Sequence, residues 1–190
     1  MEEKSSNLID LQLTEEESKI INENMPVKTY EKGTVLLREG QISVDSYHVI
    51  KGCIRSYYLK DGEERTTAFF TEDQSCASLD SYTNQVPAKH YFECVEETTV
   101  AVLNYFKEKE LIKRIPKFET LCRLAMENDY GKNQERLANF MTQSPEERYL
   151  HLLDTRPDLL ERVPQYQLAS YLGIKPESLS RIRKRIAQKK

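Results

Sequence analysis

The chain has few of the residues that build metal and redox sites, since its 190 residues include four cysteines and three histidines. The cysteines lie far apart, without the close pairs that zinc sites and redox motifs use. They are Cys53, Cys76, Cys94 and Cys122. We therefore expect reduced, structural thiols, and we assign neither a metal site nor a cofactor.

Signatures of membrane proteins, secreted proteins and enzymes are missing as well. No run approaches the roughly 18 apolar residues of a membrane helix, and the opening MEEKSSNLID lacks the layout of a signal peptide. No Gly-x-Ser-x-Gly motif or Cys-His spacing indicates a nucleophile with its base. We predict a cytoplasmic protein that contacts no membrane, is not an enzyme and has no catalytic residue.

What the sequence does have is a basic C-terminal end. Residues 142–190 hold ten Lys and Arg against six Asp and Glu, a balance of +4, whereas the first 141 residues hold 18 against 25, a balance of −7. A basic region on an otherwise acidic protein indicates a polyanionic partner for that region alone.

After Pro26 the sequence is typical of an antiparallel β-domain. Short β-rich runs are separated by glycine turns at a spacing of roughly 8 to 12 residues, as in a sandwich or barrel. Asp61-Gly62, between CIRSYYLK and EERTTAFF, predicts a β-hairpin, and HYFECVE and TTVAVLNY predict two further strands. The other turns are Lys32-Gly33, Glu39-Gly40 and Lys51-Gly52.

Helical patterns lie on both sides of this domain. Thr14 with Glu17, and Ser144 with Glu147, each form a capping box at a helix start. Between them, residues 117–141 predict a helix of about 25 residues, nearly 40 Å long. This helix either packs on the β-domain or forms the seam of a helix–helix dimer, and we favour the dimer. The side that it would use carries Phe118, Leu121, Leu124, Ala125, Asn128, Leu137 and Met141.

The stretch QLASYLGIKPESLSRIRKRI, residues 167–186, predicts two short helices joined by a turn. Gly173 suits a chain leaving a helix with positive φ, and Ile174 fills the turn. In the second helix the apolar residues Leu179, Ile182 and Ile186 are spaced three and four residues apart, so they share one face and leave a polar face opposite. The pattern predicts a helix-turn-helix whose second helix enters the major groove of DNA. The alternative is a charged, solvated helix.

Three blocks together make the chain similar to the Crp/Fnr superfamily of bacterial transcription regulators. They are GTVLLREG followed by SYHVIKGCIRSYY, the long helix, and LASYLGIKPESLSRIRKRI. The resemblance covers nearly the whole chain and implies an α+β fold. Its parts are an N-terminal antiparallel β-roll (jelly roll) of the cyclic nucleotide-binding kind over residues 1–116, a dimerisation helix over 117–141, and a C-terminal winged helix-turn-helix over 142–190, with the helix-turn-helix itself at about 165–187.

The resemblance also implies a homodimer that binds double-stranded DNA at an inverted repeat, with RNA polymerase as a further candidate partner. In the family pattern Glu177 and Arg181 match positions that contact bases, and Ser178 matches one that contacts the backbone. Arginine can donate two hydrogen bonds to guanine, and a carboxylate can accept from cytosine. A well-known member has arginine where this chain has Pro176, and proline has no side-chain donor, so we expect that base contact to be absent. The DNA-binding candidates are Lys175, Glu177, Ser178, Ser180, Arg181, Lys184 and Arg185.

The family's cyclic-nucleotide binders hold the ribose with a Gly-Glu pair and the phosphate with an arginine. The corresponding stretch here offers Ala77-Ser78 and Lys89-His90-Tyr91 as effector-pocket candidates, and no arginine occurs between Arg65 and Arg114. Lysine or histidine replaces the forked guanidinium poorly. We expect no tight binding of cAMP or cGMP and leave the effector unknown. An iron–sulfur sensor would need cysteines near the N-terminus, and the first is Cys53.

Two other interpretations stay open. A cupin-like enzyme or small-molecule-binding β-barrel could carry a basic tail that does not contact DNA, although a cupin metal site needs a tight histidine cluster and these histidines are isolated. Alternatively, the protein is a binding module whose tail contacts only other proteins.

Overall fold

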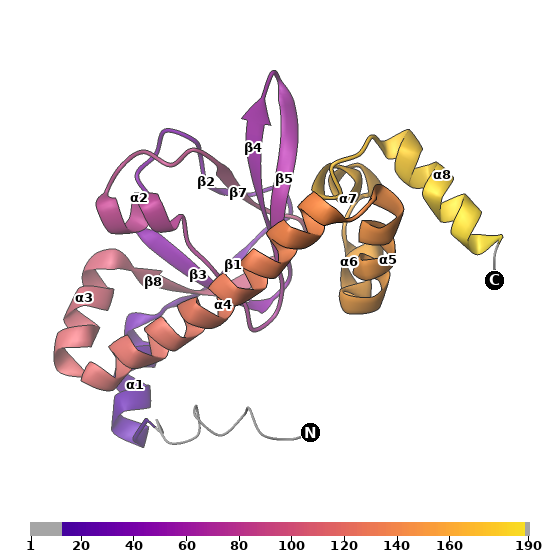
Figure 1. Ribbon diagram of the computed structural model, residues 1–190. Helices are drawn as coiled ribbons and strands as arrows, with labels where there is room; N and C mark the ends of the chain where they lie inside the picture. The colour runs from indigo at the N-terminus through magenta and orange to yellow at the C-terminus, as the bar shows by residue number, and fades with distance from the viewer. Residues whose placement is uncertain (1–12, 189–190) are drawn as a thin grey trace, which may run out of the picture.

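The computed structural model describes residues 13–188, so the opening stretch MEEKSSNLID and the last two lysines lie outside the described residues. Figure 1 shows a β-roll, a long helix α4 that lies across it, and a group of helices at the far end of α4. No helix within the described residues is long and apolar enough to span a membrane.

The β-roll consists of two four-stranded antiparallel sheets, with strand orders β1-β8-β3-β6 and β2-β7-β4-β5. Alternate side chains point between the sheets, and Val49, Ile54, Phe92 and Val100 are almost completely buried there. This confirms the predicted antiparallel β-domain. The strands are β1 (Val27–Tyr30), β2 (Val35–Leu37), β3 (Asp45–Lys51), β4 (Ile54–Lys60), β5 (Glu63–Phe70), β6 (Ser75–Cys76), β7 (Tyr91–Cys94) and β8 (Thr98–Asn104), and the short helix α2 (Leu79–Asn84) follows β6.

Two of the predicted turns have backbones that explain their residues. Asp61 and Gly62 both have positive φ, 54° and 79°, and they join β4 to β5 as the expected hairpin. Gly52 has a φ of 109°, and a Cβ there would lie 2.6 Å from the Cα of Thr98. Only glycine therefore fits the turn between β3 and β4.

A second apolar cluster joins the N-terminal helix to the helices that follow the roll. Ile21 of α1 (Glu15–Asn24), Leu111 of α3 (Tyr105–Arg114) and Phe118 of α4 (Pro116–Thr142) are buried in it. The capping box of Thr14 and Glu17 starts α1 as predicted. The cluster fixes the first turn of α4 against the roll.

This packing corrects one detail of the predicted dimer seam. Phe118 was expected on the same side of the helix as Leu137 and Met141, but its exposed fraction is 7%, against 61% and 77% for the other two. The reason is that α3 covers the first turn of α4. Within α4, Phe118 is the buried residue, whereas Met126, Tyr130, Leu137, Phe140 and Met141 are exposed.

The C-terminal helical unit consists of helices alone within the described residues. These are α5 (Pro145–Thr155), α6 (Pro157–Arg162), α7 (Gln165–Tyr171) and α8 (Pro176–Ala187). The capping box of Ser144 and Glu147 starts α5 as predicted. The two strands of the expected wing have no counterpart in the described chain, where every strand lies between residues 27 and 104. The structure confirms the other predicted parts of the fold, which are the α+β class, the roll, the long helix and the helix-turn-helix.

The core of this helical unit continues into the outer surface of the β-roll. Leu159, Leu168 and Leu179, from three of its helices, belong to the same buried cluster as Cys53 and Phe69 of the roll. The ring of Phe69 packs edge-on against Tyr171, with centroids 5.2 Å apart. The helical unit and the roll therefore share one apolar interface.

Candidate nucleic-acid interface

Helices α7 and α8 form the predicted helix-turn-helix, and the turn depends on Gly173. Its φ is 69°, and its N–H donates to the carbonyl oxygen of Ser170 at 3.0 Å. The next N–H, of Ile174, donates to the carbonyl oxygen of Ala169 at 3.0 Å. These bonds satisfy carbonyl groups at the end of α7, in the way that a left-handed glycine usually ends a helix.

One face of α8 holds it on the rest of the helical unit. Leu179 and Ile182 are buried, with exposed fractions of 1% and 7%, and Ile174 and Ile186 pack against the same cluster. Burial of two such side chains stabilises the docked helix by about 3 to 6 kcal/mol. The apolar face that the spacing predicted is thus confirmed, and it fixes which side of α8 points outward.

The outward side of α8 carries the DNA-binding candidates. Glu177, Ser180 and Arg181 are exposed, and Ser178 is half-buried and accepts a 3.3 Å hydrogen bond from Arg181. Residues 176–187 hold four basic residues against one acidic residue. In Figure 1, α8 stands at the end of the molecule away from the β-roll. The other exposed candidates are Lys175, Lys184 and Arg185.

Two of the basic side chains on α8 already have partners within the protein. Arg185 forms an ion pair with Glu146 of α5, and Arg183 donates to the side chain of Gln165 at 2.5 Å. Both contacts tie the far part of α8 to the neighbouring helices. The first turn of α8 has no side-chain cap at Lys175.

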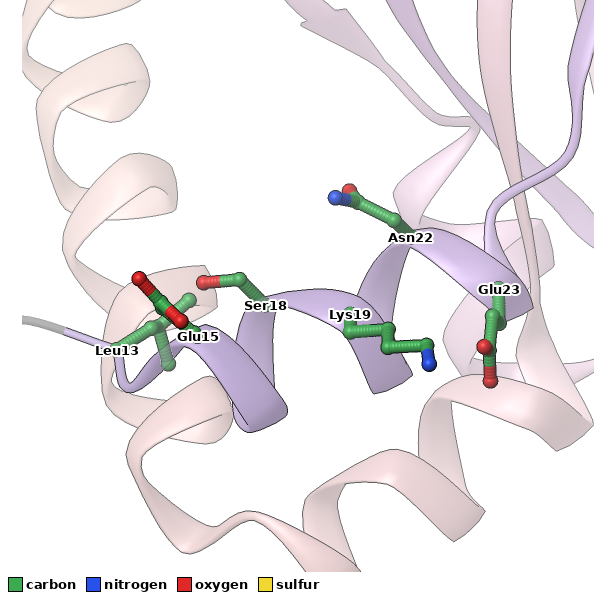
Figure 2. Close-up of a pocket in the computed structure, with 6 residues that line it drawn as sticks. All are labelled: Leu13, Glu15, Ser18, Lys19, Asn22 and Glu23. Atoms are coloured by element: carbon green, nitrogen blue, oxygen red, sulfur yellow. The ribbon is translucent and has the colours of Figure 1, made fainter.

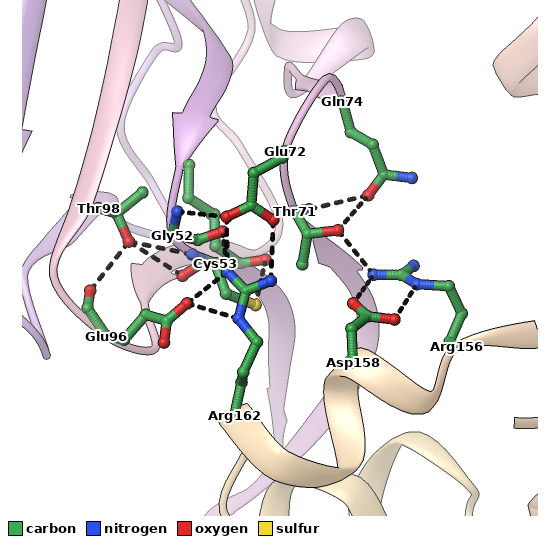
Figure 3. A network of polar contacts seen from close by, with 11 residues as sticks. Gly52, Cys53, Thr71, Glu72, Gln74, Glu96, Thr98, Arg156, Asp158 and Arg162 are labelled. Carbon is green, nitrogen blue, oxygen red and sulfur yellow. Dashed lines mark hydrogen bonds and ion pairs between the residues drawn. The ribbon is translucent and has the colours of Figure 1, made fainter. Parts of the chain in front are cut away.

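A polar network holds the helical unit against the loops of the roll, as Figure 3 shows. Arg162 of α6 donates to both carboxylate oxygens of Glu72 at 2.8 Å, to Glu96 at 2.6 Å and to the carbonyl oxygen of Gly52 at 2.8 Å. The hydrogen bonds from Arg162 lower the pKa of the Glu72 carboxyl to about 2, and the N–H of Gly52 acts in the same direction. Nearby, Arg156 bonds to Asp158 and to Thr71.

The same interface continues along β5. The hydroxyl of Ser170 on α7 donates to the carbonyl oxygen of Glu64 at 2.8 Å and accepts from the N–H of Thr66 at 2.9 Å. Arg136 of α4 donates to the carbonyl oxygen of Thr67. Sequence reasoning missed these contacts of Ser170, Arg136 and Arg162 with the roll, because each joins residues between 66 and 110 positions apart and no local pattern marks them.

The five effector-pocket candidates do not converge on one hollow. Ala77 lines an open cleft of about 1810 Å³ between the roll and α4, together with residues such as Phe70 and Asn133, but the other four candidates do not line it. Ser78 is buried and Lys89 is exposed. Within the described residues, no hydrogen bond or ion pair links Ser78 to Lys89, His90 or Tyr91.

The remaining two candidates belong to aromatic clusters of the roll. The His90 ring lies 4.9 Å from that of Phe92, and burial lowers its pKa, which favours the neutral imidazole. The Tyr91 ring stacks on Tyr57 with centroids 4.9 Å apart. These contacts give both side chains a packing role in the roll.

Neither the cysteine thiols nor a hollow along α1 has the features of a functional site. The cysteines are free thiols, and burial raises the pKa of Cys53 to about 12 and that of Cys94 to about 11, as expected for unreactive structural thiols. A hollow of about 610 Å³ lies along α1, and Figure 2 shows the six residues that line it. Its polar side chains carry charges of both signs on a single helix, and its lining residues are Leu13, Glu15, Ser18, Lys19, Asn22 and Glu23.

Comparison with known proteins matches this architecture. Residues 27–114 match the family model of the cyclic nucleotide-binding domain. No curated protein sequence matches the chain. Among solved structures, the c-di-GMP responsive global regulator CLP of Xanthomonas campestris is 15% identical with a TM-score of 0.73, and the alignment covers 93% of each chain.

Two other solved structures have a similar fold. FixK2 of Bradyrhizobium japonicum is 16% identical with a TM-score of 0.74, covering 87% of this chain and 85% of that one. A Crp/Fnr-family protein of Eubacterium rectale is 17% identical with a TM-score of 0.70, covering 93% and 85%. Residues 27–114 are therefore similar to a cyclic nucleotide-binding domain. The described chain as a whole has the fold of Crp/Fnr transcription regulators, which confirms the predicted resemblance.

Proposed function

We propose that the protein is a sequence-specific DNA-binding transcription regulator of the Crp/Fnr type, which acts in the cytoplasm as a homodimer on an inverted repeat. The observation that carries this proposal is the geometry of α8. Its apolar face is buried, its basic face is exposed, and the glycine turn before it holds both in place. This is how a helix-turn-helix presents its second helix to the major groove.

Glu177 and Arg181 are the proposed base-contacting residues, because they are exposed one turn apart on the first half of α8. Arginine reads guanine by two parallel hydrogen bonds, and glutamate accepts from the cytosine amino group. Lys175, Ser178, Ser180, Lys184 and Arg185 would bind the phosphates. For Arg185 this requires exchange of the Glu146 carboxylate for a phosphate.

The proposed dimer seam is an exposed stripe of α4 that differs from the side expected from the sequence and shares Leu137 with it. Met126, Tyr130, Leu137 and Phe140 have exposed fractions between 48% and 66%. With Asn133 between them they recur at intervals of four, three, four and three residues, which is the spacing of a coiled-coil seam. Four such side chains facing water favour a second copy of the helix as their partner. We therefore also propose that the chain divides into a roll, a dimerisation helix and a DNA-binding unit.

We further propose that cAMP is not the effector, despite the family of the domain. At the candidate phosphate position, burial favours the neutral form of His90 and Lys89 is exposed, and no arginine occurs between Arg65 and Arg114. A cyclic phosphate there would lack a forked, permanently charged partner. Millimolar cAMP or cGMP should leave the melting temperature of the purified protein within about 1 °C, since a ligand that does not bind adds no stability.

Binding to a pool of randomised duplexes at two salt concentrations tests the function itself. A dimer that contacts several phosphates should lose affinity steeply, by about tenfold or more between 50 and 200 mM salt. No shift at either concentration would overturn the proposal and favour a module whose tail contacts protein. RNA polymerase is a candidate partner of the DNA-bound form.

A further inference from the structure

Arg148, in the first turns of α5, donates hydrogen bonds to the ends of two other helices. Its Nη1 donates to the carbonyl oxygens of Phe140 at 3.3 Å and Gln143 at 2.7 Å, where α4 ends. Its Nε and Nη2 donate to the carbonyl oxygen of Leu172, where α7 ends, at 3.1 and 2.8 Å. One guanidinium thus joins the end of the long helix to the start of the helix-turn-helix turn.

The chemistry of these positions explains why an arginine fits them. The last carbonyl groups of a helix have no partner within the helix, and the helix dipole places partial negative charge there. A guanidinium has donors on three nitrogens in one rigid plane, so it can bond to two helix ends at once. A lysine ammonium carries the same charge but cannot span both ends with the same fixed geometry.

The side chain of Phe140 packs between Arg148 and Gly173. The guanidinium carbon of Arg148 lies 4.7 Å from the centre of the Phe140 ring. The same ring lies so close to Gly173 that a Cβ on the glycine would be 2.8 Å from it. Phe140 is also the last residue of the proposed α4 seam. The seam, Arg148 and the turn before α8 therefore form one contiguous packing unit.

We propose that Arg148 is a positioning residue, which fixes the angle between α4 and the helix-turn-helix and thereby the half-site spacing that the dimer accepts. This inference rests on the proposed function, because the spacing has meaning only for a dimer that binds an inverted repeat. In such a dimer the separation of the two α8 helices depends on how each is held relative to the seam. The Arg148 contacts are the polar bonds that hold the turn at Leu172 to the end of α4.

The test compares spacing preference between the wild-type protein and Arg148→Met. The probes are duplexes with the inverted repeat that the wild type selects from a randomised pool, with the spacer unchanged, shortened or lengthened by one or two base pairs. The wild type should bind one spacing best. In Arg148→Met the ratio of affinities between the best spacing and its one-pair neighbours should fall at least about threefold, because a loosely held helix pair tolerates more separations.

Arg38→Met, at an exposed position on the roll, is the matched control and should keep the wild-type ratio. If Arg148→Met does not fold, Arg148→Lys is measured instead, with the same direction expected. An unchanged spacing ratio, or an equal loss of affinity at every spacing, would overturn the inference. Failure of the wild type to bind any duplex would instead refute the proposed function, so the two failures are distinguishable.

Discussion

Arg162 in α6 and Glu72 in the loop after β5 are 90 residues apart in the sequence, and the guanidinium donates one 2.8 Å hydrogen bond to each oxygen of the carboxylate. The same side chain also bonds to Glu96 and to the carbonyl oxygen of Gly52. One residue thereby ties the helical unit to three loops of the roll. We expect the helix-turn-helix to follow changes in those loops rather than to move independently of the roll.

Replacement of Arg162 tests how much this contact contributes. Arg162→Met should lower the free energy of unfolding by about 1 to 3 kcal/mol, because its partners Glu72 and Glu96 lose a charged donor in a partly buried place. Urea denaturation measures the loss. Arg65→Met is the matched control, since Arg65 pairs with Glu63 on the exposed hairpin, and it should change stability by less than about 0.5 kcal/mol. Equal effects of the two changes would contradict the role of Arg162.

The Glu72–Arg162 pair also predicts a pH dependence of stability. The pKa of Glu72 is lowered from 4.5 to about 2 in the folded protein, so its ionised form is stabilised by folding. That stabilisation is fully present above the unfolded pKa of 4.5 and is lost as the pH falls toward 2. Because the Glu72 side chain is 40% exposed, solvent screening reduces the contribution to about 1 to 2 kcal/mol. Wild type and Glu72→Gln should therefore differ in urea stability by about this amount at pH 6 and by clearly less at pH 3. A constant difference would argue against the pair.

Two glycines predict opposite effects of the same substitution. Gly173→Ala should lower stability by about 1 to 3 kcal/mol, because its φ is 69° and the new methyl group would clash with Phe140. Gly131→Ala, within α4 and with open space around it, should raise stability by about 0.5 to 1 kcal/mol. Thermal unfolding of both variants checks the prediction, and it fails if Gly173→Ala is as stable as the wild type.

The dimer seam can be tested with one charge at two neighbouring positions. Leu137→Asp places a carboxylate within the exposed stripe and should weaken dimerisation by about 100-fold or more, since it removes apolar contact and adds like charges. Ala138→Asp adds the same group on the adjacent, exposed side of α4 and should leave the dimer intact. Sedimentation equilibrium measures both. A monomeric wild type, or equal loss in both variants, would exclude this seam.

Features with a local signal could be predicted from the sequence. The hairpin at Asp61-Gly62, the two capping boxes and the turn at Gly173 each depend on residues within a few positions of one another, and the structure confirms them. The exposed and buried faces of α8 follow from its 3.6-residue period. The wing had no such signal, because it came from the resemblance alone.

The interface between the roll and the helical unit could not be predicted, for a physical reason. Arg162, Glu72 and Ser170 are polar residues in short loops and helices, and in the sequence they look like ordinary solvated groups. Only the folded chain shows that their partners lie opposite them. Phe118 illustrates the same limit, since a helical period groups residues into a stripe but does not show that α3 covers one end of it.

The proposed roles on α8 separate base contact from phosphate contact. Lys184→Ala should weaken binding to all duplexes alike and reduce the slope of log affinity against log salt by about one, because it removes a phosphate contact. Arg181→Ala should instead cost about 1 to 3 kcal/mol on the selected operator and lose preference at one base pair. Fluorescence anisotropy titrations on matched duplexes distinguish the two outcomes.

The most direct test of the central claim is therefore the affinity of wild type and Arg181→Ala for the selected inverted repeat and for the same repeat with one symmetric base pair changed in each half. The account predicts that the wild type discriminates the two duplexes by about tenfold or more and that Arg181→Ala binds both almost equally. If Arg181→Ala discriminates at every position as well as the wild type does, Arg181 does not contact a base and the proposed use of α8 is contradicted.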